Sequence, residues 1–175
     1  MPRKIVVFGH PALRKKASPV ERKDFGSEEL LKIIRDMSEA LSATPDGIGI
    51  AAPQIGVPLQ IFIASEEALA IDRGGDVNQN EKKRWKHHIF INPEILKKSA
   101  KKSKMTEGCL SVPGKCGVVA RAEKIRVRAF DEHGKKFERG ASNLFARLIQ
   151  HELDHLDGIL YVDKAESIID ADAKK

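Results

Sequence analysis

Gln150-His151-Glu152-Leu153-Asp154-His155 is a short histidine-containing stretch near the end of the 175-residue chain. It lies in a predicted helix that begins at about Ser142 and ends at Gly158. Histidines four residues apart lie one above the other on a helix, so both imidazoles can reach one metal ion. Glu152 is not needed as a ligand, so it can take a proton from metal-bound water and deliver it again. Because catalytic sites of this kind use three protein ligands, the third must come from another part of the sequence.

The candidate for this third ligand is Cys109, in the segment Glu107-Gly108-Cys109-Leu110-Ser111. A lone cysteine is more often a small buried residue than a ligand. This one follows a glycine in a polar segment, which predicts a turn that directs the thiol outward. A thiolate and two imidazoles form a tetrahedral set with one open position. Cys116 is a competing candidate, although its Lys-Cys-Gly setting offers no comparable partner.

Other interpretations of the histidine pattern stay open at this point. A surface helix can carry it by chance, since short motifs have a real rate of false matches. The chain could also be a zinc metallopeptidase or a metal-stabilised binding module without catalytic activity. In a metallopeptidase the third ligand would be a carboxylate, and the candidates are Asp157, Asp163 and Glu166.

Length and composition are those of one globular domain, residues 1–175, in which we expect a short, frayed tail from about residue 164. The hydrophobic fraction is 41%, and no apolar run approaches the roughly 20 residues that span a bilayer. The N-terminus lacks the pattern of a signal peptide, so we expect a cytoplasmic protein without a membrane partner. A reducing compartment would keep both cysteines as thiols.

The net charge of +6 is concentrated in one part of the chain. Between Lys82 and Lys104 nine basic residues face a single acidic one, Glu94. Such a segment can attract a polyanion such as ribosomal RNA, although lysines on a solvated loop and strand edge are the simpler interpretation. Nothing indicates a DNA partner.

The hydrophobic pattern predicts an α+β fold, with antiparallel β-sheets wrapped around a central C-terminal helix. An amphipathic helix is predicted over residues 27–43, where Ser27 is the N-cap and apolar residues recur at spacings of four, three and four. Residues 65–86 read as a long connection with a helical turn at 68–70. The predicted strands are 59–64, 88–91 and 94–98 (broken at Asn92-Pro93), 124–130, 135–138 and 159–162.

The segment Gly47-Ile48-Gly49-Ile50-Ala51-Ala52-Pro53-Gln54 contains glycines among small apolar residues, which allow close approach of the backbone. Together with Glu-Gly-Cys-Leu-Ser at 107–111 and Gln-His-Glu-Leu-Asp-His at 150–155, it resembles the three signature motifs of peptide deformylase. The matching order and separations extend the resemblance over residues 4 to 163. Neither rival interpretation explains the glycine-rich segment or Gln54.

This resemblance implies an enzyme that removes the N-formyl group from the initiator methionine of nascent chains and releases formate. It implies Cys109, His151 and His155 as ligands of Fe(II), for which zinc or nickel can substitute. It also implies that Glu152 is the acid/base and that Gln54 and the backbone N–H of Leu110 stabilise the oxyanion. The substrate-binding residues expected from it are Gly47, Ile48, Gly49, Met105, Glu107, Gly108, Leu144, Arg147 and Leu148.

Arg147 departs from the pattern, because we expect an apolar residue in the methionine pocket. It lies one turn before His151 and is expected near Met105 and Ile48. A guanidinium is not left unpaired in a dry pocket, so it either extends its charge into water or presents a donor to the substrate. We favour the first arrangement, since methionine carries no charge. The resemblance also implies an arginine where Cys116 stands, and we expect no C-terminal helix for docking on the ribosome after Asp163.

Overall fold

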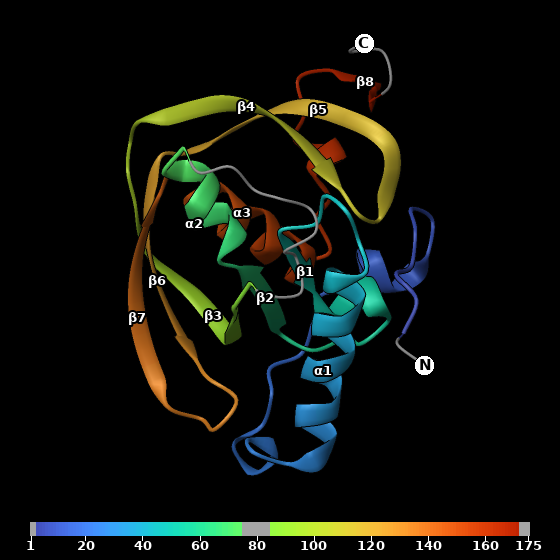
Figure 1. Cartoon of the computed structure of the whole chain (residues 1–175), viewed down its shortest axis with the longest axis vertical. Coiled ribbons are helices and arrows are strands. Elements are labelled where there is room, and N and C mark those ends of the chain that lie inside the picture. Colours follow the sequence, from blue (N-terminus) through green and yellow to red (C-terminus); the bar gives the residue numbers. More distant parts are fainter. Residues whose placement is uncertain (1–2, 75–84, 172–175) are drawn as a thin grey trace.

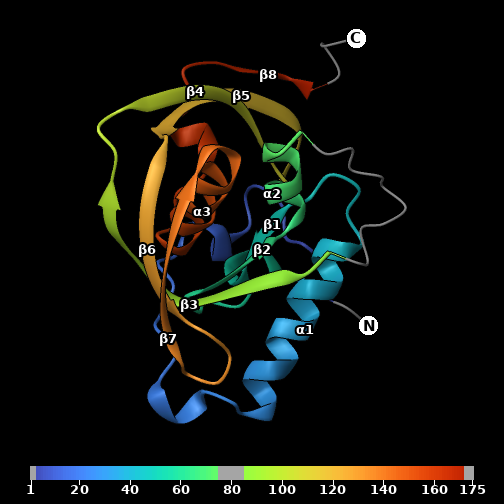
Figure 2. The same ribbon diagram turned by 60° about the vertical axis from the view of Figure 1, so that its left-hand side comes forward.

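The computed structural model describes residues 3–74 and 85–171, arranged as two antiparallel sheets around one central helix (Figures 1 and 2). The helices, of which those marked η are short 3-10 turns, are η1 (Pro11–Arg14), η2 (Arg22–Asp24), α1 (Glu28–Ser42), η3 (Ala52–Ile55), α2 (Glu67–Asp72), α3 (Asn143–Leu156) and η5 (Tyr161–Asp163). The strands are β1 (Gly49–Ala51), β2 (Ile61–Ser65), β3 (His87–Lys98), β4 (Lys102–Cys109), β5 (Val112–Ala122), β6 (Lys124–Phe130), β7 (Lys136–Ser142) and β8 (Ile168–Asp170).

The larger sheet has the strand order β1-β2-β3-β6-β7, and the smaller one has the order β4-β5-β8. Every pair of neighbouring strands is antiparallel. Figure 2 shows α3 enclosed by β4 and β5 on one side and by the larger sheet on the other, while α1 lies outside. The predicted α+β class with a central C-terminal helix is therefore confirmed.

The larger sheet buries both of its faces at β2, where all five side chains are buried and successive ones point to opposite faces. On β2, Phe62 and Ala64 contribute to the cluster around α3, whereas Ile61 and Ile63 contribute to the cluster around α1. Both clusters are almost fully excluded from solvent. The position of α3 is thus determined by an apolar face of the sheet. The polar motif residues of α3 therefore lie on the side of the helix that faces away from this sheet.

The start of α3 is stabilised from a distant part of the chain. Ser142 is the N-cap residue but makes no side-chain capping bond, and Asn143 has a φ of 52°. Asp72, at the end of α2, instead accepts hydrogen bonds from the backbone N–H groups of Leu144 (3.0 Å) and Phe145 (3.2 Å). These N–H groups have no partner within the helix, so α2 and α3 are joined at this end.

Several predicted elements agree closely with the structure. The amphipathic helix at 27–43 is α1 with Ser27 as its N-cap, and the strand at 124–130 is β6. The helical turn at 68–70 is part of α2, and the strand at 135–138 is the beginning of β7. The connection predicted over 65–86 partly lies outside the described residues.

Other predictions were wrong. The predicted break at Asn92-Pro93 is a register shift within one continuous strand, β3. Asn92 adopts a φ of 48°, and its side chain exchanges two hydrogen bonds with the backbone of Val20. Instead of a strand at 159–162, the structure has η5, because Asp163 accepts a hydrogen bond from the N–H of Leu160.

The tail and the smaller sheet were also not anticipated. Residues 168–170, in the segment expected to fray, form β8 and pair with residues 115–117 of β5. Strand β4 carries mostly exposed polar side chains, so its sequence lacks the alternation that identifies a strand. Within the described ranges, no helix combines the length and apolarity needed to cross a membrane.

Candidate active site

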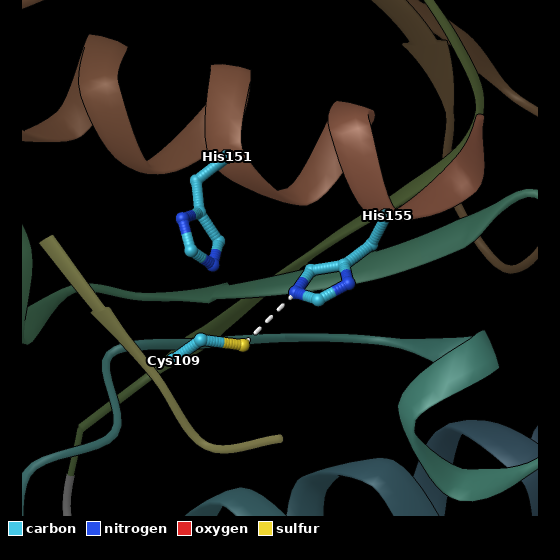
Figure 3. A group of neighbouring side chains, drawn as sticks. All are labelled: Cys109, His151 and His155. Carbon is cyan, nitrogen blue, oxygen red and sulfur yellow. Dashed lines mark hydrogen bonds between the residues drawn. The ribbon is translucent and has the colours of Figure 1, made fainter. Parts of the chain in front are cut away.

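Cys109, His151 and His155 converge on one point beneath α3 (Figure 3). Their ligand atoms all lie within 4.8 Å of one another, and the Sγ of Cys109 is 3.3 Å from the Nε2 of His155. Both imidazoles descend from α3, one turn apart, toward the thiol on the opposite side. Among the described residues this is the one group of His, Cys, Asp or Glu side chains that could hold a metal ion.

Cys109 reaches this point because it ends β4, immediately before the turn into β5. The backbone N–H of Ser111 lies 3.4 Å from the Sγ of Cys109, which stabilises negative charge on sulfur. The competing candidate for the third ligand, Cys116, lies away from the cluster, on β5 opposite Ile169.

The three carboxylates considered for a metallopeptidase have other partners in the structure. Asp163 pairs with Arg14, Glu166 pairs with Lys104, and Asp157 lies 3.7 Å from Lys16. None of them belongs to the cluster of potential ligands among the described residues. The structure places Cys109, and none of these carboxylates, next to the two histidines.

Glu107 orients the first histidine. Its Oε2 lies 2.9 Å from the Nδ1 of His151, which leaves Nε2 of this ring for the cluster. The same carboxylate accepts hydrogen bonds from Arg121 and Arg147, and all three side chains are buried. Burial raises the pKa of Glu107, but the hydrogen bonds from Arg121 and His151 outweigh it and hold the pKa well below its usual range. Glu107 is therefore a buried carboxylate anion behind the site.

Asp154, which lies on α3 with His151, extends the ionic network formed by Glu107, Arg121 and Arg147. It accepts hydrogen bonds from Arg121 (2.8 Å) and Lys164 (2.7 Å). Arg121 was not among the functional residues expected from the sequence, although one signal was present. Arg121 follows the buried Val119 by two residues and so shares its inward face on β5.

Glu152 lies beside the cluster with its carboxylate almost without hydrogen-bond partners. The side chain is 2% exposed, and its Oε2 is buried with no partner among the described residues. Burial raises the pKa of Glu152 to about 7. A carboxylate with this pKa can both accept and return a proton near neutral pH.

Gln54 is held so that its amide N–H group faces the cluster. Its Oε1 accepts the backbone N–H of Ala51 at 2.8 Å, which determines the orientation of the amide. Its Nε2 lies 3.2 Å from the Oγ of Ser111 and 3.6 Å from the Sγ of Cys109. Ser111 is completely buried and was not singled out from the sequence.

A cavity of about 480 Å³ opens above these residues. It is bordered by thirteen of the residues expected at the site, whereas His155 does not line it and is 1% exposed. Those thirteen residues are Gly47, Ile48, Gly49, Gln54, Glu107, Gly108, Cys109, Leu110, Leu144, Arg147, Leu148, His151 and Glu152. Met105 does not border the cavity, and its side chain is 43% exposed.

The arrangement expected for Arg147 was wrong. Its guanidinium does not extend into water, since the side chain is only 5% exposed. Nη1 donates to Glu107 (2.6 Å) and to the carbonyl oxygen of Val119 (2.8 Å), and Nη2 donates to the carbonyl oxygen of Ser103 (2.7 Å). A buried charge is stable only when it is paired and hydrogen-bonded, and the buried Glu107 provides the pairing.

The cluster fits a divalent metal ion by its donor set. One thiolate and two imidazoles leave one coordination position for water or substrate, as in catalytic sites. Burial lowers the pKa of His155 well below its usual value, which keeps its ring neutral and able to ligate. At His151, burial is outweighed by Cys109 and Glu107, which raise the pKa to about 10. The cluster thus attracts positive charge to the point where the ligand atoms meet.

Comparisons with known proteins agree with this geometry. A family model described as Polypeptide deformylase matches residues 2–170. The chain is 44% identical over 163 residues to a peptide deformylase of Pseudothermotoga lettingae, covering 93% of this chain and 82% of that protein. It is 41% identical to peptide deformylase 1A, chloroplastic/mitochondrial, of Arabidopsis thaliana, covering 91% of this chain but spanning only 60% of the plant protein's length.

Solved structures with the same fold lead to the same family. An actinonin-bound class I type b peptide deformylase from Acinetobacter baumannii has a TM-score of 0.80 at 30% identity, with 95% of this chain and 99% of that chain covered. A peptide deformylase from Legionella pneumophila has a TM-score of 0.78 at 38% identity, with 95% and 87% covered.

Proposed function

The chain belongs to the polypeptide deformylase family, and on this premise we propose that it removes the N-formyl group from the N-terminal methionine of nascent proteins. The products are formate and a free amino terminus. The observation that carries this proposal is the juxtaposition of the Cys109–His151–His155 cluster with the buried Glu152, whose Oε2 has no partner among the described residues. Cys109, His151 and Glu152 also border one cavity.

We propose Cys109, His151 and His155 as ligands of Fe(II), for which zinc or nickel can substitute. Thiolate and imidazole donors suit all three metals. When bound, a metal at this position supplies Lewis acidity and lowers the pKa of a water molecule that it binds.

Glu152 then acts as the proton carrier. It accepts the proton of the attacking water as the oxygen bonds to the formyl carbon, and it delivers this proton to the amine nitrogen as the C–N bond breaks. Its pKa of about 7 suits both steps. Gln54 and Leu110 border the same cavity, so the Nε2 of Gln54 and the backbone N–H of Leu110 can donate to the oxyanion that forms on the formyl oxygen.

The remaining cavity residues bind the peptide. Ile48, Leu144 and Leu148 present apolar side chains that suit an uncharged methionine. Strand β1 is an edge strand of the larger sheet, so the peptide main chain can pair with it as an added strand. Main-chain pairing does not depend on downstream side chains, as an enzyme that processes many new proteins requires.

The test is formate release from formyl-Met peptides by protein purified without oxygen and loaded with iron. We expect stoichiometric formate and free amine, and no cleavage of internal peptide bonds. Internal cleavage without formate would support a metallopeptidase instead. Air should inactivate the iron form while the zinc form survives with lower activity, because a thiolate beside Fe(II) is open to oxidation. Equal stability of both forms in air would contradict the assignment of iron.

We also propose that exposed lysines at the ends of β3 and β4 contact ribosomal RNA in the cytoplasm. Lys97, Lys98, Lys101 and Lys102 are exposed, while Lys82, Lys83 and Arg84 lie outside the described residues. Binding through phosphates weakens steeply with salt. Co-sedimentation with ribosomes at low salt should be lost when the four exposed lysines are replaced by alanine, and unchanged co-sedimentation would refute this contact.

A further inference from the structure

Arg147 joins α3 and β4, which carry the candidate metal ligands, to the neighbouring strand β5. Its backbone belongs to α3, one turn before His151. Its guanidinium donates to Glu107 and to the carbonyl oxygen of Ser103, both on β4, and to the carbonyl oxygen of Val119 on β5. We propose that Arg147 is a positioning residue that sets the geometry of the Cys109–His151–His155 cluster. This inference rests on the proposed function.

The first route from Arg147 to the cluster passes through Glu107. Arg147 Nη1 and Arg121 Nε both donate to the Oε1 of Glu107, at 2.6 and 2.5 Å. The Oε2 atom accepts from Arg121 Nη2 and lies against His151 Nδ1, both at 2.9 Å. Two planar guanidinium groups therefore hold the carboxylate in one orientation, and this orientation directs the ring of His151.

The second route leads to Cys109 through the backbone of the smaller sheet. Ser103 lies opposite Arg121, and Val119 lies opposite Met105, in the register of β4 and β5. Arg147 bonds to one carbonyl oxygen of each strand, so it determines how closely this strand pair approaches α3. Strand β4 then runs directly to Cys109, which makes the distance from thiolate to imidazoles depend on the same contacts.

Arg147 is poorly suited to recognise a charged substrate, although it borders the cavity. Both Nη atoms already donate to protein acceptors, and Nε is buried without a partner among the described residues. A buried Nε–H cannot reach a ligand without movement of the side chain. Its contacts therefore point to the metal ligands rather than to the formyl-methionine side chain.

The experiment compares Arg147→Met with wild type after loading with Co(II), whose absorption spectrum reports the geometry of its thiolate and imidazole ligands. We expect Arg147→Met to shift these bands and to release Co(II) to a chelator about 10-fold faster, the lower end of effects seen when groups behind a metal ligand are removed. Arg147→Lys retains the charge without the planar guanidinium group, so its absorption bands and its rate of Co(II) release should fall between those of wild type and Arg147→Met.

Arg126→Met is the matched control, because Arg126 is 62% exposed and pairs with Glu138 away from the cavity. It should show the spectrum and release rate of wild type. If Arg147→Met does not fold, the same measurements on Arg147→Lys decide the matter. A wild-type spectrum and release rate in the folded variant would overturn the proposal, even if KM for formyl-Met peptides rose.

The failure of this inference can be distinguished from a failure of the proposed function. If wild-type protein binds the metal but releases no formate, the deformylase reaction is wrong whatever Arg147 does. If wild type releases formate and the Arg147 variants keep an unchanged metal site, only the positioning role is wrong.

Discussion

Gly49 leaves open the space that the carboxylate of Glu152 occupies. A Cβ atom added to Gly49 would lie 2.7 Å from the Oε1 of Glu152 and would also overlap the side chain of Leu148. Both of these side chains are buried, so neither can move freely away. The glycine of the proposed substrate-binding edge thus also determines the position of Glu152, the proposed proton carrier.

Gly49→Ala should lower kcat for formyl-Met peptides by about 100-fold, because a displacement of a reacting group by about 1 Å can have an effect of this size. The bound metal should be retained, since the nearest atoms to an added Cβ belong to Leu148 and Glu152 rather than to the three ligands. Steady-state kinetics and metal analysis test this. Gly140→Ala on β7 is the control, because an added Cβ there meets nothing within 4 Å. Equal kcat in both variants would contradict the relationship.

Glu152→Gln should retain the metal and the fold but lose turnover by about 10²- to 10⁴-fold, the range for a lost proton transfer. The amide keeps the size of the side chain and cannot accept the proton of water. Formate release and metal content are measured on the same preparation. A metal-loaded variant with nearly normal turnover would show that another group carries the proton.

Glu107→Gln should lower the free energy of unfolding at pH 7 by about 3–5 kcal/mol, the range for breaking a buried ion pair. The pKa of Glu107 is lowered in the folded state, so its contribution is fully present above the unfolded value of about 4.3. As pH falls below that value toward the folded pKa, the contribution is lost.

Urea unfolding of metal-free protein between pH 7 and 3 measures this dependence. The difference between wild type and Glu107→Gln should shrink on acidification. Glu94→Gln is the control, because Glu94 is 66% exposed and lies 3.9 Å from Arg128. A constant difference across the pH range would mean that the charge of Glu107 does not provide the stability.

Asp72→Ala should lower the free energy of unfolding by about 1 kcal/mol, the usual effect of removing a helix cap. Its carboxylate receives two backbone N–H groups at the start of α3, and alanine cannot replace it. Asp72→Asn should retain most of the stability. Arg73→Ala, at the neighbouring exposed residue, is the control. Equal unfolding curves for Asp72→Ala and Arg73→Ala would show that Asp72 does not stabilise the start of α3 as a cap.

The sequence by itself determined the central helix, the pairing of His151 with His155 and the nearby acid/base candidate. These features depend on the 3.6-residue period of one helix, which is a local property of the chain. The sequence motifs also indicated Cys109 and Gln54, which the fold brings to the same cavity as Glu152. Strands with alternating apolar residues were also recognised, because their two-residue period is likewise a local property of the chain.

Only the tertiary structure decided which buried charges are partners. Arg147 was expected to extend into water, but it pairs with Glu107 across 40 positions of sequence. Strands β4 and β5 bring Arg121 and the backbone acceptors of Arg147 to α3, and the polar sequence of β4 gave no sign of a strand. A charge is stable inside a protein only where partners from other elements surround it, and such partners are defined by long-range packing rather than by local pattern.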